Sequence, residues 1–348
     1  MSARRIARLV QHQLTMSNGF HMNSDRIKPL KVVVSALTRR RPEMLGSLIG
    51  SWGTMDIPDN TQIVLLIVEN DDAPRSADHI AQYGTLENGT EVTYVHEPEL
   101  GIPFGRNRAA KEAIAIGADL LAFVDDDEVV AQDWLVQLIG AYRNSDAVLI
   151  GGPLRVKKTE RTLSFVDALM DTCIAQRYLR KETRAARRAD LTGTPGVTIV
   201  TNNWLGETAI FDRHNIWFDE KMRFTGGTDS KLSAEVKAAG LPTAWAKDAA
   251  VYEEIPTERL SIAYQFKRGR DQSSTNYHRK IDGNAKARLN VLVSVPIKLV
   301  IIAGLVVALP FTGGRTLLDV VRTSGWVAGR IDALFGRRSD LYKTVTGD

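Results

Sequence analysis

Four consecutive acids, Asp125 to Glu128, are the residues of this sequence with the clearest chemical potential. They follow an apolar run over 118–124 that predicts a buried strand. Because unpaired carboxylates are costly to bury, they must meet water, a cation or a ligand where the strand ends. Carboxylate oxygens suit Mg²⁺ or Mn²⁺, and such an ion would hold a diphosphate. The alternative is an acidic first turn of a helix over 129–142, which the helix dipole would favour.

Two further acidic clusters fall near expected strand ends or helix starts. Residues 69–72 are Glu-Asn-Asp-Asp, and Asp229 follows two glycines and a threonine. In open α/β sheets, ligands bind outside the carboxyl ends of the strands. An ion at one such end and a separate carboxylate suggest a reaction in which a diphosphate leaves while the carboxylate deprotonates an incoming hydroxyl. The alternative for Asp229 is a helix N-cap, and one residue could serve both purposes.

Arginines near glycines are the expected partners of phosphate. Residues 101–108, Gly-Ile-Pro-Phe-Gly-Arg-Asn-Arg, predict a turn before a helix over 107–115, and Arg106 could offset a phosphate charge or hold the acids. Arg268 and Arg270 suit phosphate better than a lysine, because a guanidinium is a planar fork. The segment contains neither GxGxxG nor GxxxxGK[ST], so the sequence does not support a dinucleotide-binding fold or a P-loop.

The rest of the chain predicts the elements that position these residues. Apolar and β-branched runs predict strands, with one further strand carrying both Trp245 and Val251. The other strands are expected over 31–37, 62–68, 92–95, 120–124 and 147–151. Helices are expected over 42–52, 76–83, 107–115, 159–189 and 229–239. This alternation indicates βαβ units and an α/β fold with a mostly parallel sheet flanked by helices.

The composition is that of an ordinary globular protein. The chain has 348 residues, 25% charged and 44% hydrophobic, and its net charge of +4 is too small to indicate nucleic acid. The single cysteine, Cys173, cannot form an internal disulfide and fits a reducing compartment. Residues 1–29 show no export signal, and we expect an N-terminal tail that could form a short basic amphipathic helix.

The C-terminal region, 286–348, differs from the α/β domain expected over 30–285. Residues 291–311 are nearly all apolar and long enough to span a membrane, but Pro296 and Lys298 interrupt them. Residues 316–335 mix apolar side chains with arginines, which is typical of an interfacial helix on anionic lipid. We expect a membrane-associated region at the cytoplasmic face of the inner membrane; the alternative is a buried helical hairpin.

In this order and at this spacing, the motifs over about 31–270 resemble the inverting family 2 glycosyltransferases with a GT-A fold, bacterial succinoglycan-type enzymes most of all. Asp125-Asp126-Asp127 matches the DxD motif of that family. The resemblance implies that Asp127 ligates Mg²⁺ or Mn²⁺ and that Asp229 is the catalytic base. Thr228 replaces the glutamate that usually precedes this base.

The resemblance also implies substrate contacts. A nucleotide-diphosphate sugar would contact Thr38, Arg39, Glu69, Asn70, Asp71, Arg106, Asp125, Asp126, Arg268 and Arg270. The acceptor would contact Asn203, Trp204 and Thr228. The implied reaction is inverting transfer of a sugar to a glycan acceptor, which we expect to be lipid-linked, in cell-surface polysaccharide biosynthesis.

Two other functions remain open from the sequence. A sugar-phosphate nucleotidyltransferase would carry a glycine-rich basic loop after its first strand; residues 36–41, Ala-Leu-Thr-Arg-Arg-Arg, are basic but contain no glycine. The other is an inactive membrane-bound scaffold that binds nucleotides, against which the acids at 125–127 and Asp229 argue.

Overall fold

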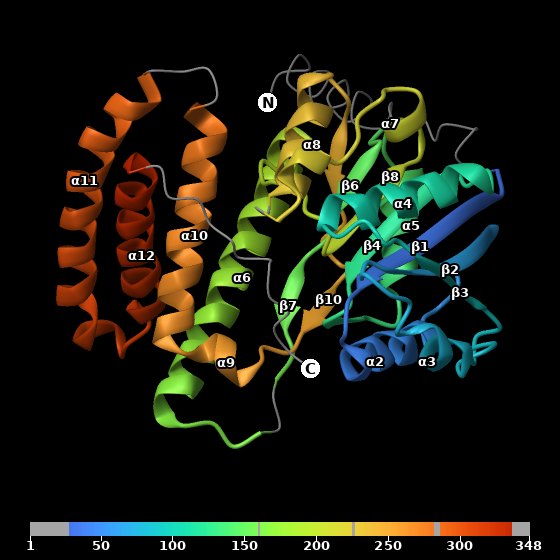
Figure 1. Cartoon of the computed structure of the whole chain (residues 1–348), viewed down its shortest axis with the longest axis horizontal. Coiled ribbons are helices and arrows are strands. Elements are labelled where there is room, and N and C mark those ends of the chain that lie inside the picture. The colour runs from blue at the N-terminus through green and yellow to red at the C-terminus, as the bar shows by residue number, and fades with distance from the viewer. Residues whose placement is uncertain (1–27, 159–160, 225–226, 282–285, 336–348) are drawn as a thin grey trace, which may run out of the picture.

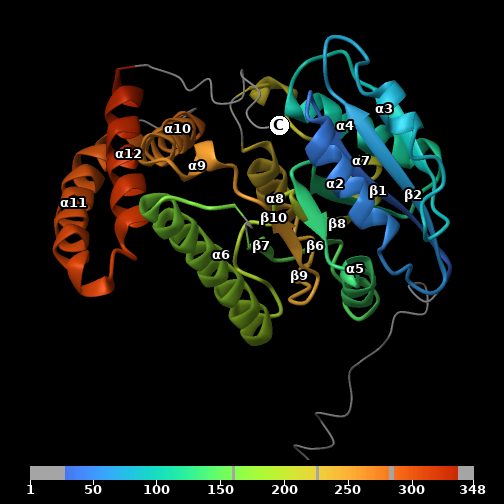
Figure 2. The same ribbon diagram turned by 90° about the horizontal axis from the view of Figure 1, so that it is seen from below.

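The computed structural model describes residues 28–158, 161–224, 227–281 and 286–335, so the helix expected in the N-terminal tail lies outside the described residues. A central sheet with helices on both faces forms one part of the molecule (Figure 1). Long helices from the C-terminal third form a separate layer beside it, as Figure 2 also shows. The layer also contains residues before 286, since α10 (Ile262–Ile281) packs on α12 (Leu317–Leu334), so the domain boundary expected after residue 285 stays a prediction.

The central sheet is mostly parallel, as expected. Its seven strands lie in the spatial order β3 (Val92–His96), β2 (Thr61–Glu69), β1 (Leu30–Thr38), β4 (Leu120–Asp125), β8 (Asn203–Glu207), β6 (Leu149–Gly151) and β9 (Thr243–Trp245). Only β8 runs antiparallel to its neighbours in this sheet. A second sheet contains β5 (Glu128–Val130), β10 (Val251–Glu253) and β7 (Leu154–Val156). Trp245 and Val251 therefore lie on two strands, and the single strand expected there is wrong.

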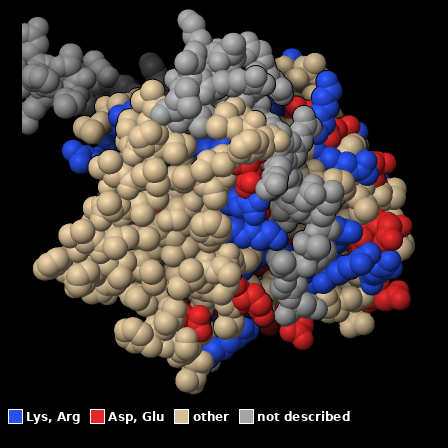
Figure 3. Space-filling model, turned by 60° about the vertical axis from the view of Figure 1, so that its left-hand side comes forward, with Lys and Arg blue, Asp and Glu red and all other residues tan. Residues whose placement is uncertain are grey.

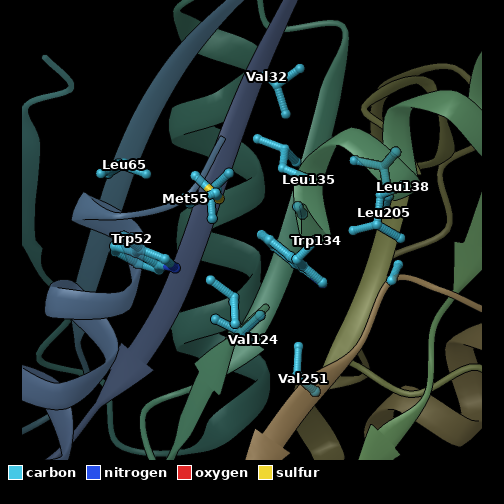
Figure 4. Packing of buried hydrophobic residues seen from close by; sticks show 14 of the residues in the cluster. Val32, Trp52, Met55, Leu65, Val124, Trp134, Leu135, Leu138, Leu205 and Val251 are labelled. Atoms are coloured by element: carbon cyan, nitrogen blue, oxygen red, sulfur yellow. The ribbon is translucent and has the colours of Figure 1, made fainter. Parts of the chain in front are cut away.

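Successive side chains of each central strand enter two different cores, because they point to opposite faces of the sheet. Val32 and Val34 of β1 belong to the first core, part of which is drawn in Figure 4, and Val33 belongs to the second. The first core is covered by α2 (Pro42–Gly53), α3 (Ala77–Ala81) and α5 (Trp134–Arg143), and the second by α4 (Ile102–Ala115), α7 (Ala209–Asp212) and α8 (Thr228–Ala238). With both faces covered, a central strand is apolar throughout, which explains the unbroken apolar runs of the sequence.

The strand register brings the polar residues to one edge. Thr38 pairs with Glu69 across β1 and β2, and Leu37 pairs with Asp125 across β1 and β4. After Asp125 the chain enters β5, where Glu128 lies opposite Glu253 of β10. The acids therefore do not begin a helix, because a turn and a short strand separate them from α5.

The segment expected to be a turn at 101–108 is helical almost throughout. Helix α4 begins at Ile102, directly after Gly101, whose φ of 138° is readily adopted only by glycine. Pro103 occupies the first turn, where its missing N–H costs no helical hydrogen bond. Arg106 consequently projects from a rigid helix rather than from a loop.

The remaining helices form the C-terminal layer and its connection to the sheets. They are α6 (Phe165–Thr192), α9 (Thr257–Leu260), α10 (Ile262–Ile281), α11 (Lys286–Ala308) and α12 (Leu317–Leu334). A third core joins α6, α9 and α12 and contains the buried Cys173, which therefore has a packing role. No helix in the described part of the chain has the length and apolarity needed to cross a membrane.

Helices α10 and α12 pack backbone against backbone. A Cβ added at Gly269 of α10 would lie 2.5 Å from the carbonyl oxygen of Arg322. A Cβ at Gly325 or Gly329 of α12 would collide with the backbone oxygens of Phe266 or Arg270. Only glycine permits this approach, since backbone atoms cannot rotate away as side chains can.

We expect Gly329→Ala to lower the free energy of unfolding by about 1–3 kcal/mol through overpacking. The matched control is Gly304→Ala in α11, because a Cβ there meets nothing within 4 Å. Alanine in a helix interior is otherwise favoured over glycine by about 1 kcal/mol, so the control should be neutral or stabilising. Urea unfolding of both variants measures the difference, and equal effects of the two would contradict the packing described here.

Candidate active site

The acids after β4 are held by cations and a hydroxyl from neighbouring elements. Thr38 Oγ1 donates to Asp126 Oδ2 at 2.9 Å, and Arg41 Nη1 donates to Asp126 Oδ1 at 2.8 Å. Arg259 Nη1 donates to Asp127 Oδ2 at 3.1 Å, and Arg41 lies 3.7 Å from the same oxygen. Asp126 thus has both oxygens bound within the protein, whereas these contacts leave Oδ1 of Asp127 without such a partner.

Arg106 connects this strand end to the start of α8. Its Nη1 donates to Thr228 Oγ1 at 3.0 Å, and its Nη2 lies 3.8 Å from Asp125 Oδ1. Asp229 follows Thr228 in the first turn of α8, after Gly227 with φ 81°. Residues far apart in the sequence, Asp125 and Asp229, therefore lie in one site.

A second group of side chains extends the site toward α6. Arg259 also donates to Glu253 Oε1 at 3.0 Å, and Tyr178 of α6 donates its hydroxyl to Glu253 Oε2 at 3.0 Å. Glu253 is thus held by the protein next to Asp127. Through the shared contact with Arg259, the structure brings Glu253 to the acids after β4.

The electrostatic environment raises the pKa of several of these acids. Burial raises the pKa of Asp125 to about 7, with Arg106 opposing the rise and Asp127, Asp126 and Asp229 adding to it. The pKa of Asp126 rises to about 6 through burial and the charge of Asp127, against Arg41 and Thr38. The side chain of Asp125 keeps 46% of its surface exposed, so it is accessible to a ligand. Negative charge is therefore in excess at this strand end.

Lys181 of α6 also belongs to this environment. Desolvation lowers the pKa of the Lys181 ammonium group, and the nearby charge of Asp229 opposes that shift. Helix α6 therefore contributes a cation beside Asp229 and a hydroxyl beside Glu253. It forms the wall of the site that faces the C-terminal helices (Figure 1).

The polar residues after β2 hold the neighbouring loops. The Glu69 carboxylate is buried and accepts hydrogen bonds from Ser76 N, Ser76 Oγ and Tyr94 Oη. Asn70 donates to two backbone carbonyl oxygens and accepts from Gly101 N. The structure therefore turns the side chains of Glu69 and Asn70 inward, which corrects the expectation that they face a ligand.

Asp71 is buried under a set of arginines. Arg39 Nε, Arg40 Nε and Arg75 Nε lie 3.1, 2.6 and 3.2 Å from its carboxylate oxygens. These partners hold the pKa of Asp71 well below its ordinary value, against the effect of burial. Arg39 keeps 27% of its side chain exposed beside this pair, so its contact with a nucleotide stays a prediction.

Two predicted acceptor-binding residues lie in the interior of the domain. Asn203 is buried; it accepts from Trp134 Nε1 at 2.9 Å and donates to the carbonyl oxygens of Pro153 and Ala249. Trp204 is 2% exposed, and its ring stacks on Phe123 within the second core. A buried, fully bonded amide and a core indole leave nothing for an acceptor to contact, so these two expectations are corrected.

Arg270 pairs with Asp332 of α12, on the side of α10 that faces the C-terminal layer. Arg270 keeps 42% of its side chain exposed in this pair, so its contact with the donor diphosphate stays a prediction. Burial and the charge of Asp127 raise the pKa of Glu253, and Arg268, two residues earlier on the helix than Arg270, opposes that rise together with Arg259. Of the two predicted phosphate ligands on α10, the structure brings only Arg268 to the site.

The donor set fits a divalent ion whose shell a diphosphate completes. Within the described residues, no three histidine, cysteine or acidic side chains are grouped so as to hold a metal by themselves. Mg²⁺ in such sites is usually bound by one or two carboxylates together with substrate phosphates. Asp125 and Asp127, in a locally negative environment, provide those oxygens, and Asp127 remains the predicted ligand.

Sequence reasoning missed three contributors to the site, namely Arg41, Tyr178 and Lys181. Arg41 follows Thr38 and Arg39 in the basic run after β1, so its position next to a predicted ligand was a usable signal. Tyr178 and Lys181 are the fourteenth and seventeenth residues of a 28-residue helix, and no local pattern distinguishes them from its other polar residues.

Comparison with known proteins agrees with the fold and the family resemblance. Residues 28–273 match the model of "Glycosyltransferase like family 2". Succinoglycan biosynthesis protein ExoM from Rhizobium meliloti is 27% identical over 246 residues, 69% of this chain and 72% of that protein. The mannosyltransferase PcManGT from Pyrobaculum calidifontis, solved with GDP-Man and Mn²⁺, superposes with a TM-score of 0.57 at 14% identity, over 96% of this chain and 95% of that chain.

S. aureus TarS 1–349 in complex with UDP-GlcNAc gives a TM-score of 0.47 at 13% identity, over 88% of this chain and 91% of that chain. The likeness to PcManGT shows a shared fold, a GT-A-like α/β architecture. The family match covers well over half of the chain. The protein is therefore a member of glycosyltransferase family 2.

Proposed function

We propose that this glycosyltransferase transfers a sugar from a nucleotide-diphosphate donor to a lipid-linked glycan hydroxyl, with inversion, in polysaccharide biosynthesis. One observation carries the proposal: Arg106 contacts both Asp125 and Thr228 and so joins the acids after β4 to the start of α8, where Asp229 lies. Inverting transfer needs a base on the opposite side of the sugar from the leaving group. Carboxylates on two separate elements suit this requirement, because those on β4 can act at the leaving group while the one on α8 accepts the proton.

Asp229 is the proposed base. It lies in the first turn of α8, where the helix dipole favours the carboxylate form. The carboxylate would accept the proton of the acceptor hydroxyl as its oxygen attacks the sugar carbon, and the bond from that carbon to the diphosphate breaks.

The leaving diphosphate would be stabilised at the end of β4. A bound Mg²⁺ or Mn²⁺, held by Asp127 with Asp125 beside it, would neutralise charge on the departing group. Arg259 contacts both Asp127 and Glu253, and Arg268 acts electrostatically on Glu253; guanidinium groups of this kind bind phosphate oxygens bidentately. Arg106 orients Asp125 and Thr228 relative to each other.

The C-terminal layer supports a location at a membrane surface, which we propose to be the cytoplasmic face of the inner membrane. Helix α11 leaves Val293, Val300 and Val307 63, 74 and 67% exposed, and Phe311 beyond it is 86% exposed. Figure 3 shows a broad face without charges over this side of the molecule. Trp326 of α12 lies beside Arg330 and Lys298, a combination that suits the headgroup level.

A donor panel tests the proposed function. We expect the full chain to bind one nucleotide-diphosphate sugar at least about 10-fold more tightly with Mn²⁺ or Mg²⁺ than with EDTA, because the ion bridges carboxylate and diphosphate. Calorimetry with GDP- and UDP-sugars measures this. Release of pyrophosphate from a nucleoside triphosphate and a sugar phosphate would instead indicate a nucleotidyltransferase. No binding of any nucleotide sugar would contradict the proposal.

A further inference from the structure

A cavity of about 330 Å³ lies between α6 and the start of α12, outside the strand-end site. Gln176, Leu179 and Arg180 of α6 form one wall, and Arg315, Thr316 and Asp319 form the other. Nothing in the proposed chemistry at β4 and α8 uses this cavity. Its lining residues are two arginines, an aspartate, a threonine, a glutamine and a leucine, and the side-chain stems make most of its surface apolar.

Positive charge exceeds negative charge around the cavity. Asp319 is the only acid among its lining residues, and it lies 3.3 Å from Arg180 and 3.8 Å from Arg177. No carboxylate of the described chain pairs with Arg315, which is exposed at the other wall. Two guanidinium groups thus contact the one carboxylate, and a third, that of Arg315, also lines the cavity.

A further cation lies deeper along the same face of α12. Arg322, one turn beyond Asp319, donates from Nε to the neutral Gln265 Oε1 at 2.9 Å, and no described carboxylate pairs with it. Its pKa falls to about 10, through burial first and then through Arg268 and Arg177. A partly buried cation without an anion is unfavourable, so a bound anion would stabilise this arrangement.

These cations lead toward the active site. Arg268 and Arg322 both act electrostatically on Tyr178, which contacts Glu253 and through it Arg259. On α6, Arg180 lines the cavity while Lys181, the next residue, is near Asp229. Helix α6 thus carries a residue of the cavity next to one that interacts electrostatically with the proposed base.

The cavity also borders the apolar face of the C-terminal layer. Phe311 lies four residues before the lining residue Arg315 and is 86% exposed. Figure 3 shows Lys and Arg gathered at the edge of the face without charges. A ligand with an apolar tail and an anionic head would match these two adjoining surfaces. Its tail would lie on α11 and its head among the arginines.

We propose that this guanidinium pocket, lined by Arg180 and Arg315 with Arg177 and Arg322 on the same two helices, binds the phosphate group of the membrane-anchored acceptor. The inference rests on the proposed function, since it adds an acceptor site to the transferase. Arginine is suited to this role because its planar fork matches phosphate oxygens and stays charged when partly buried. The phosphate would fix the acceptor so that its terminal hydroxyl reaches Asp229.

The test uses the full chain and phosphatidylcholine vesicles that contain a polyprenyl diphosphate. We expect Arg180→Gln/Arg315→Gln to weaken co-sedimentation with these vesicles by about 10- to 100-fold, the effect of losing charged hydrogen bonds. The control, Arg187→Gln/Arg213→Gln, removes the same charge from exposed positions outside the cavity and should bind as the wild type does. Equal losses in the two variants would overturn the proposal.

Two further measurements separate the alternatives. Vesicles with phosphatidylglycerol at the same phosphate charge should bind the wild type more weakly; equal binding would mean general headgroup recognition and would overturn the acceptor assignment. Donor binding with Mn²⁺ should be unchanged in both variants, because the substituted arginines lie outside the donor site. If the wild type binds no donor at all, it is the proposed function that fails, whatever the vesicles show.

Discussion

Asp229→Asn is expected to reduce sugar transfer by roughly 1,000-fold, because an amide cannot accept the proton of the acceptor hydroxyl. The substitution keeps the shape of the side chain and the first turn of α8, where Ser230 N donates to Asp229 Oδ1 at 2.7 Å. Donor affinity should change by no more than about 2-fold, since the base acts on the acceptor and only in the transition state. Initial rates and calorimetric donor binding measure the two effects.

The matched control for this prediction is Glu235→Gln on the same helix. Glu235 is exposed and pairs with Lys231 at 2.7 Å, so its loss removes one carboxylate from α8 without touching the site. Exposed pairs of this kind contribute about 0.3–0.5 kcal/mol, and we expect an unchanged rate. Near-normal turnover in Asp229→Asn would show that another group takes the proton.

The central sheet could be predicted because its strands are buried on both faces. The apolar run of β1 and the acids that end β4 required no knowledge of the rest of the chain to be recognised. Parallel strands with helical connections then place those acids at one sheet edge by geometry alone. The outline of the site therefore follows from local pattern and strand direction.

What the sequence does not determine is which polar side chains remain available to a ligand. Glu69 and Asn203 carry chemical groups that a nucleotide or sugar could use, yet Ser76, Tyr94, Trp134 and backbone carbonyls occupy them. Those partners are up to 69 residues away in the chain. A buried polar group must be bonded, but the identity of its partner depends on tertiary packing.

The contribution of α6 to the site also depends on tertiary packing, so it could not be predicted from the sequence. A helix of 28 residues carries many polar side chains, and its face toward the site is fixed by the third core, in which Met170 and Cys173 pack on Leu318 of α12. The residue identities on α6 alone do not show this contact. The packing of α6 against α12 therefore places Tyr178 and Lys181 at the site. Helix α12 begins at Leu317, which is 139 residues after Tyr178 and 136 residues after Lys181.

Asp127→Asn is expected to abolish the gain in donor affinity that Mn²⁺ or Mg²⁺ provides, and to lower transfer by about 100-fold or more. A neutral amide is a weak ligand for a hard cation, so the ion would lose its proposed protein anchor beneath the diphosphate. Arg259 would keep its other partner, Glu253 at 3.0 Å, so the fold should be retained. Calorimetry of the donor with and without the ion measures the loss, and circular dichroism checks the fold.

Asp126→Asn tests whether Asp126, the acid before the predicted ligand Asp127, stabilises the fold rather than binding the ion. Asp126 accepts hydrogen bonds from Thr38 and Arg41 on its two oxygens, so we expect its loss to lower the free energy of unfolding by about 1–3 kcal/mol. The Mn²⁺-dependent gain in donor affinity should persist in that variant. The reverse pattern, with the gain lost in Asp126→Asn and kept in Asp127→Asn, would assign the ion to the other carboxylate. Loss of the gain in Asp127→Asn alone would support the division of the DxD acids, one oriented toward the ion and one bound within the fold.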